Sequence, residues 1–303
     1  MRETYKGFAL TLRDGRRWWI TGDEYNIQWV EELATIMQLE NCPSNSSPKL
    51  IFSKMIGANN TRYGENCIEH WGLCTKGPND SGWRNEDHGS IRIWYHNHFP
   101  DIICEIKTND GDGKYVNMWI SLRSIYNKSI SSGGLPFHAG LVELDGRGVL
   151  LAGPGGTGKS TCCRRLPGYW KALCDDETLV IPDKQGKYWA HPFPTWSNYH
   201  MKRGEKTWNV QYAVPLCGVF FLEQSKTDEI TSLGEGKTAI LMTESAFQVC
   251  LDSRKELAAK DRVESRKAFF NSASRIAKEV PAFRLRVSLH GRFWKEIEKV
   301  LKW

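Results

Sequence analysis

The chain has 303 residues, which is enough for one large or two modest domains with a buried core. Its formal charge of +6 is spread along the sequence, without a run of basic and aromatic residues, so the composition does not favour nucleic-acid binding. No apolar run approaches transmembrane length and the nine cysteines form no C-x-x-C pair, so we expect a cytoplasmic protein with reduced thiols that binds no membrane.

The first third of the chain predicts an α+β region. Its expected elements, in chain order, are a hairpin over 4–21 that turns at Asp14-Gly15, a helix over 25–39, and strands over 49–55, 90–95 and 101–106. Residues 57–89 are rich in Gly, Asn, Asp and Pro and lack periodicity, so we expect a long loop or an insertion there. We place His96 and His98 in a solvated turn.

A boundary between two domains is expected where a helix ends at a glycine-containing break. Residues 117–130 carry apolar side chains at helical spacing, and the break at 131–134 follows them directly. We therefore divide the chain into an N-terminal region over 1–116 and a larger domain over 117–303. Packing in the core is the simpler explanation for the thirteen tryptophans. The alternative is that aromatic side chains of the N-terminal region form a binding surface for a peptide.

The larger domain predicts a mixed α/β fold. Its expected strands cover 137–143, 148–151, 178–182, 214–222 and 283–288, and its expected helices cover 161–166, 246–250, 263–280 and 292–301. We expect an irregular loop over 191–196, because Pro192 and Pro194 lack the N–H groups that regular strand pairing uses.

One glycine-rich stretch carries the strongest functional signal. The apolar run 149–152 reads as a buried strand, and residues 153–160, GPGGTGKS, fit the pattern G-x-x-x-x-G-K-[ST]. The glycines let successive N–H groups curl around a polyphosphate, Lys159 reaches its terminal phosphates, and the Ser160 hydroxyl binds Mg²⁺. The expected nucleotide-binding residues are Gly153, Pro154, Gly155, Gly156, Thr157, Gly158, Lys159, Ser160 and Thr161. The alternative is a strand-to-helix turn that binds nothing.

Two adjacent carboxylates follow this loop. Asp175 and Asp176 come sixteen and seventeen residues after Lys159. Neighbouring side chains of an extended backbone point in opposite directions, so one carboxylate faces the nucleotide while the other pairs with a fixed base. The facing carboxylate stays ionised near Mg²⁺ and Lys159 and accepts a proton from an attacking hydroxyl. The alternative is a solvated turn that begins the strand over 178–182.

His138 adds a third element, because it lies fifteen residues before Gly153 on the preceding strand. The spacing H-(15)-GxxxxGKS-(16)-DD resembles the C-terminal domain of HPr kinase/phosphorylase and the related phosphoenolpyruvate-carboxykinase-like fold. Longer strings, among them GGLPFHAGLVELDGRGVLLAGPGGTGKSTCCRRLP, LCDDETLV and AHPFPTWS, are similar to the SynChlorMet cassette protein ScmC family over nearly the whole chain. That family is an HPr-kinase-like component of gene cassettes that also encode radical SAM proteins and a small PqqD-like protein.

The resemblance implies a serine/threonine kinase that acts on a peptide or small protein, with ATP and Mg²⁺ as cofactors. Carried over by position, the resemblance makes Asp175 the catalytic base. It also makes Asp175 and Ser160 the metal ligands. It makes Asp176 the orienting neighbour of Asp175, Lys159 a ligand of the β- and γ-phosphates, and His138 a contact on the phosphate side. A homo-oligomer is a further expectation, because HPr kinase relatives form oligomers.

The chain departs from HPr kinase after the Asp pair. The Gly- and Ile-rich second signature is absent, and HPFPTW and SNYHMKRGEKTW stand in its place, which predicts a different acceptor-binding region. Candidates for the missing positive charge are Arg203, Arg284 and Arg286. Two rival functions remain: a nucleotide-gated module that delivers a peptide without turnover, and a phosphotransferase acting on a small molecule. The Asp pair argues against the first, because a passive binder has no use for two carboxylates beside phosphates.

Overall fold

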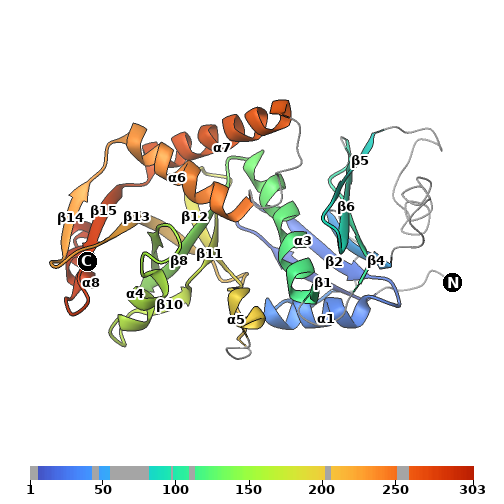
Figure 1. Cartoon of the computed structure of the whole chain (residues 1–303), viewed down its shortest axis with the longest axis horizontal. Helices are drawn as coiled ribbons and strands as arrows, with labels where there is room; N and C mark the ends of the chain where they lie inside the picture. The colour runs from blue at the N-terminus through green and yellow to red at the C-terminus, as the bar shows by residue number, and fades with distance from the viewer. Residues whose placement is uncertain are drawn as a thin grey trace. The chain divides into compact units, whose positions relative to one another are not determined.

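The structure, a computed structural model, describes residues 6–42, 48–54, 82–96, 98–108, 113–201, 206–250 and 259–303 (Figure 1). The chain forms two compact units, each built from separate segments. The first unit combines Met1–Thr11, Arg16–Ser124 and Trp196–Thr207, and the second combines Leu12–Gly15, Ile125–Thr195 and Trp208–Trp303. Both units contain mixed β-sheets and helices, so the predicted mixed α/β class is confirmed.

The described strands of the first unit form one mixed sheet in the order β3-β1-β2-β4-β7-β6-β5. Its elements are β1 (Gly7–Thr11), β2 (Arg17–Gly22), α1 (Ile27–Ile36), β3 (Glu40–Asn41), β4 (Lys49–Lys54), β5 (Trp83–Asp87), β6 (Ile91–His96), β7 (Ile102–Ile106), the first part of α3 (Gly113–Ile130) and α5 (Ser197–His200). The pairs β2–β4 and β4–β7 are parallel, and the remaining pairs are antiparallel. The core includes Trp18, Leu33 and Phe52, all at most 1 % exposed.

The expected hairpin, the helix at 25–39 and the three strands of this unit are confirmed. Two expectations are wrong. Part of the expected loop at 57–89 is strand β5, which pairs antiparallel with β6, while residues 55–81 lie outside the described residues. His96 is not in a solvated turn: it ends β6, is 2 % exposed and packs its ring 5.2 Å from Trp83 and 4.6 Å from Phe99. Aromatic packing on both sides gives an imidazole a buried position.

The second unit holds the other strands, and five of them close into a ring. Its strands are β8 (Leu135–Leu144), β9 (Arg147–Ala152), β10 (Lys171–Cys174), β11 (Glu177–Pro182), β12 (Tyr188–Phe193), β13 (Val214–Gln224), β14 (Glu229–Ser232) and β15 (Ala282–Val287). β8 pairs with β11, β11 with β12, β12 with β13, β13 with β9, and β9 with β8. The pairs β9–β13 and β13–β15 are parallel, so these three strands end at the same edge of the sheet.

The expectation of an irregular loop at 191–196 is wrong for its first half. β12 runs through Pro192, which pairs with Thr178 of β11. The other neighbour, β13, pairs with β12 only at residues 189 and 190. Pro192 therefore lies beyond the pairing with β13, where a missing N–H does not remove a ladder hydrogen bond. His191, just before it, is fully buried and hydrogen-bonded to the main chain of Arg13 and Val210.

Helices cover this ring of strands (Figure 1). They are α4 (Lys159–Arg165), α6 (Glu235–Cys250), α7 (Ala259–Glu279) and α8 (Phe293–Leu301). The expected helices are confirmed, although α6 begins at Glu235 and not at the expected residue 246. Buried side chains of β9, β13, β15, α4 and α8 form one core, including Leu151, Phe220, Phe283 and Phe293. No described helix is long and apolar enough to cross a membrane.

Candidate functional site

The glycine-rich loop follows β9, whose last four residues, 149–152, are fully buried. Gly156 and Gly158 have φ of 81° and 101°, a left-handed conformation that favours glycine. Thr157 closes a turn onto Pro154, because its N–H and its hydroxyl both donate to the Pro154 carbonyl at 3.3 and 2.8 Å. Gln224, at the end of β13, donates from Nε2 to the Gly156 carbonyl at 2.9 Å. Contacts at Pro154, Gly156 and Thr157 thus hold the loop in place.

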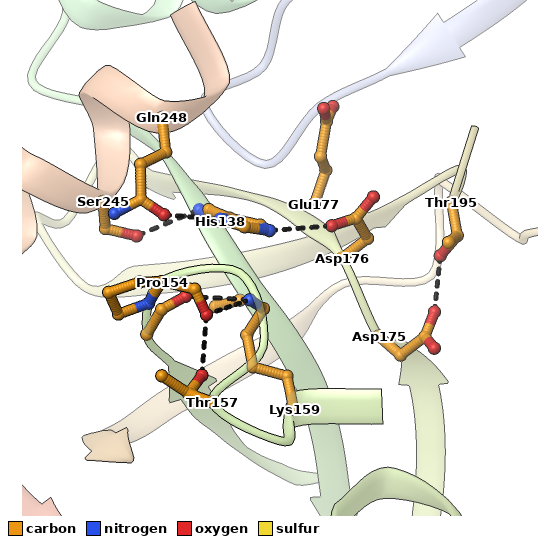
Figure 2. A network of polar contacts seen from close by, with 12 residues as sticks. His138, Pro154, Thr157, Lys159, Asp175, Asp176, Glu177, Thr195, Ser245 and Gln248 are labelled. Atoms are coloured by element: carbon orange, nitrogen blue, oxygen red, sulfur yellow. Dashed lines mark hydrogen bonds and ion pairs between the residues drawn. The ribbon is translucent and has the colours of Figure 1, made fainter. Parts of the chain in front are cut away.

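Lys159 is the first residue of α4, and its side chain folds back over the loop (Figure 2). Its ammonium donates to the carbonyls of Gly153 at 2.8 Å and Pro154 at 3.3 Å, and the residue is only 6 % exposed. Burial lowers the pKa of Lys159, and the negative charges of Asp176 and Asp175 oppose this change. The predicted lysine and both predicted carboxylates therefore share one electrostatic environment.

Asp175 and Asp176 form the junction between β10 and β11, which both pair antiparallel with β8. The residue before the junction faces Leu141 of β8, and the residue after it faces His138. The Asp pair therefore lies beside the middle of β8. On the opposite side of β8, Ala139 pairs with the last residue of β9, so the glycine-rich loop begins next to His138. Pairing with β8 brings the loop and the Asp pair together.

Gly140 allows this close arrangement. A Cβ atom at this position would lie 2.7 Å from Sγ of Cys163, 3.3 Å from the Cys174 carbonyl oxygen and 3.4 Å from Cα of Asp175. Ordinary contacts between such atoms need about 3.5 Å or more. The missing side chain thus lets helix α4 and the β10–β11 junction that carries Asp175 both pack closely against β8.

The two carboxylates have different partners, as expected for adjacent side chains (Figure 2). Oδ1 of Asp175 accepts a hydrogen bond of 2.6 Å from the hydroxyl of Thr195. Oδ1 of Asp176 lies 3.0 Å from Nε2 of His138. The side chains of His138 and Asp176 remain partly accessible, at 22 % and 30 %.

Helix α6 positions His138 from the other side. The His138 main-chain N–H donates to the Ser245 hydroxyl at 3.0 Å, and Nδ1 of the ring lies 2.6 Å from Oε1 of Gln248. Both ring nitrogens thus face oxygen atoms, one of the Gln248 amide and one of the Asp176 carboxylate. The ring is therefore held between helix α6 and the junction that carries Asp176.

A third acidic residue follows the Asp pair but belongs to the core. Glu177 is 6 % exposed and accepts a hydrogen bond of 2.9 Å from the hydroxyl of Tyr126. Burial raises the pKa of Tyr126 well above its usual value, and the neighbouring Glu177 charge adds to this effect. Figure 2 shows the Glu177 side chain extending away from Lys159. Glu177 therefore ties β11 to helix α3.

The structure adds residues that the sequence did not single out: Gln224, Thr195, Ser245 and Gln248. Gln224 ends the string FFLEQ at 220–224, and Thr195 lies in AHPFPTWS, but nothing in the local pattern of Ser245 or Gln248 points to His138. Of the predicted positive charges, Arg284 and Arg286 form ion pairs with Glu223 at 3.3 and 3.4 Å, and Arg203 lies outside the described residues.

The described part of the chain contains no cluster of three or more His, Cys, Asp and Glu side chains that could hold a metal ion. The predicted metal ligand Ser160 is half-buried in the first turn of α4. Its hydroxyl has no hydrogen-bond partner among the residues that the structure describes.

Sequence comparison then decides the family. The family model described as SynChlorMet cassette protein ScmC matches residues 102–302, well over half of the chain. The chain belongs to this family. The matched segment contains the glycine-rich loop, the Asp pair, His138 and the α6 residues that hold it, so the whole site lies within the ScmC match. No curated protein matches the chain. The wider likeness to HPr kinase remains a prediction.

Proposed function

We propose that the chain is a kinase that transfers the γ-phosphoryl group of ATP, or of another nucleoside triphosphate, to a serine or threonine hydroxyl of a peptide or small protein. The observation that carries this proposal is the meeting of charges at one loop. The buried ammonium of Lys159, two carboxylates and an imidazole surround a glycine-rich turn. Phosphoryl transfer depends mainly on positioning and charge neutralisation, and these groups supply both.

The loop fits a polyphosphate. Left-handed backbone at Gly156 and Gly158 is typical of turns whose successive N–H groups point to one side and bind an anion. Side chains at Gly155, Gly156 and Gly158 would point into open space, so a ligand can approach the rim of the loop. Lys159 would exchange the two carbonyls that it now binds for phosphate oxygens.

Ser160 and Asp175 are the residues proposed to hold Mg²⁺, because hydroxyl and carboxylate oxygens are the donors that this cation prefers. The free hydrogen-bonding capacity of the Ser160 hydroxyl within the described residues fits this role. Mg²⁺ keeps several water and phosphate ligands, so it needs no cage made of protein groups alone. When bound, it neutralises phosphate charge. Thr195 holds Asp175 in place through its 2.6 Å hydrogen bond.

Asp175 is the proposed base. Its carboxylate accepts the proton of the acceptor hydroxyl, while the hydroxyl oxygen forms a bond to the γ-phosphorus. The bond between that phosphorus and the β–γ bridging oxygen breaks, and the nucleoside diphosphate leaves. Asp176 pairs with His138 and opposes the loss of the Lys159 proton. His138 is the proposed contact on the phosphate side.

The proposed acceptor comes from the family and not from the site geometry. The family description names a cassette protein, which supports partners encoded in the same gene cassette. We include a ribosomally made peptide as the acceptor and the radical SAM and PqqD-like proteins as partners. The region over 1–116 is the proposed recognition part, and residues 117–303 are the proposed kinase domain. A homo-oligomer is part of the same proposal.

Two variants separate binding from chemistry. Lys159→Ala should weaken nucleotide binding and abolish transfer, because it removes a buried charge from the phosphate site. Asp175→Asn keeps the size of the side chain and should abolish transfer while nucleotide binding stays nearly intact. Calorimetric titration with Mg-ATP and a transfer assay with the cassette peptide measure the two properties. Equal loss of both in Asp175→Asn would contradict the base assignment. Tight binding without any transfer would instead favour the peptide-delivery module.

A further inference from the structure

A pocket of about 320 Å³ opens beside the glycine-rich loop, on the edge of the sheet where β9, β13 and β15 end. Thr157 and Gly158 of the loop form one wall, Thr161 of α4 continues it, and Ser225 after β13 and Leu289 after β15 form the opposite wall. In sheets of parallel strands, ligands bind outside the carboxyl ends of the strands. The volume is in the range of small-molecule sites.

The pocket and the phosphate cradle share the same loop residues. A ligand whose phosphates lie against the N–H groups of the loop would therefore extend directly into the pocket. We propose that this pocket holds the nucleoside of the bound nucleotide through shape and apolar contact, without reading the edge of the base. This inference rests on the proposed binding of a nucleoside triphosphate and adds how the base is held.

The loop after β15 is rigidly attached. Arg165 of α4 donates to the carbonyls of Ser288 at 2.7 Å and Gly291 at 2.6 Å. These bonds hold Leu289 beside the pocket, although its side chain is 70 % exposed. The exposed apolar side chain lines the pocket and is accessible to a ligand in it. Leu289 is thus a contact for the flat face of a base.

The polar groups of the wall are mostly engaged. The Ser288 N–H donates to Asp228 at 2.6 Å, its hydroxyl accepts from the Gly291 N–H at 2.9 Å, and the Val287 carbonyl accepts from the Ser225 N–H at 2.9 Å. Of the described residues that line the pocket, none carries a carboxylate or an aromatic ring. Hydrogen bonds to a base edge discriminate strongly between bases, whereas apolar contacts do not. Adenine and guanine nucleotides should therefore bind alike.

The test compares ATP, GTP and inorganic tripolyphosphate on the full chain by calorimetry. Tripolyphosphate reports the cradle alone, because it has no nucleoside. In the unaltered protein, ATP and GTP should bind within about fivefold of each other. Leu289→Ala should weaken the binding of ATP and of GTP by about three- to tenfold and leave the affinity for tripolyphosphate unchanged. Ile240→Ala, a truncation of a side chain that is 53 % exposed on α6 and outside the pocket, is the matched control.

A second variant fills the pocket. Ser225→Trp places an indole in the pocket and should weaken the binding of ATP and GTP by at least about tenfold, while the affinity for tripolyphosphate stays unchanged. Unchanged ATP binding in Ser225→Trp, or equal loss of tripolyphosphate, would overturn the pocket assignment. A preference of more than about a hundredfold for one purine would overturn the claim that the base edge is not read. If neither nucleotides nor tripolyphosphate bind the unaltered protein, the proposed function itself fails.

Discussion

The close packing at Gly140 gives a prediction that can be worked through from distances. An alanine here would place Cβ 2.7 Å from Sγ of Cys163, so the two atoms would have to separate by about 1 Å to reach ordinary contact. Cys163 is 8 % exposed in the core, so movement of α4 or β8 would disturb neighbouring contacts. Overpacking of this kind costs about 1–3 kcal/mol in the free energy of unfolding. Gly140→Ala should therefore destabilise the second unit by that amount.

A second change should relieve the first. Cys163→Ala removes the clashing sulfur and by itself costs about 1 kcal/mol for the small cavity it leaves. The double variant should be more stable than the sum of the single effects predicts, by about 1–2 kcal/mol. Gly168→Ala is the control, because a Cβ there meets nothing within 4 Å and its backbone is not left-handed.

Urea unfolding followed by tryptophan fluorescence measures the stability of the unaltered protein and of the four variants, and an assay of phosphoryl transfer measures the effect on the site. The added carbon would also lie 3.3 Å from the carbonyl oxygen of Cys174, the residue before Asp175, so Gly140→Ala should also reduce transfer, and the double variant should recover part of it. Additive free energies, or a Gly140→Ala protein as stable as Gly168→Ala, would refute the reasoning.

Three further predictions concern single residues. Gln248→Leu removes the oxygen that faces Nδ1 of His138, so it should lower the rate of transfer about 10- to 100-fold with little change in nucleotide affinity. Gln248→Glu keeps an oxygen there and should retain most of the rate. Equal rates in both variants would argue against a role of Gln248 in positioning His138. Asp176→Asn keeps an acceptor for His138 but removes the negative charge that opposes loss of the Lys159 proton, so Lys159 should lose its proton at lower pH. The rate of chemical modification of Lys159, measured against pH, would report this change. An unchanged pH dependence would contradict the electrostatic effect of Asp176 on Lys159. Burial lowers the pKa of His191 from an ordinary 6.5 to about 4, so the fold has its full stability above pH 6.5, where the imidazole is neutral in both states. About 3 kcal/mol of the free energy of unfolding is lost as the pH falls from 6.5 through 4. His191→Leu should flatten this part of the stability profile, and an equally steep fall in that variant would refute the assignment.

The local conformation of the glycine-rich loop can be predicted from the sequence. The loop over 153–160 carries its own signal, because its glycines take the left-handed conformation and its lysine begins the helix. The Asp pair and His138 were recognised by spacing, and strand pairing with β8 explains why the three meet. Most strands and helices followed from alternation and helical spacing, since these patterns record which face is buried.

The remaining features depend on contacts between distant segments. Gln248 reaches His138 across 110 residues of sequence, and Thr195 reaches Asp175 across 20, so no local pattern could reveal either partner. The sequence predicts that Pro192 breaks the strand, because it does not show that β13 stops pairing with β12 before this residue. His96 looked solvated beside polar neighbours, but its burial depends on Trp83 from another strand. Tertiary packing overrides local propensity in each case.

The central claim is phosphoryl transfer, and intact-mass analysis tests it most directly. The chain is incubated with Mg-ATP and the peptide encoded in the same gene cassette, beside a parallel reaction with Asp175→Asn. We expect the peptide to gain the mass of one phosphoryl group with the unaltered protein and none with the variant. An unmodified peptide that binds more tightly in the presence of ATP would contradict it and favour a nucleotide-gated delivery module.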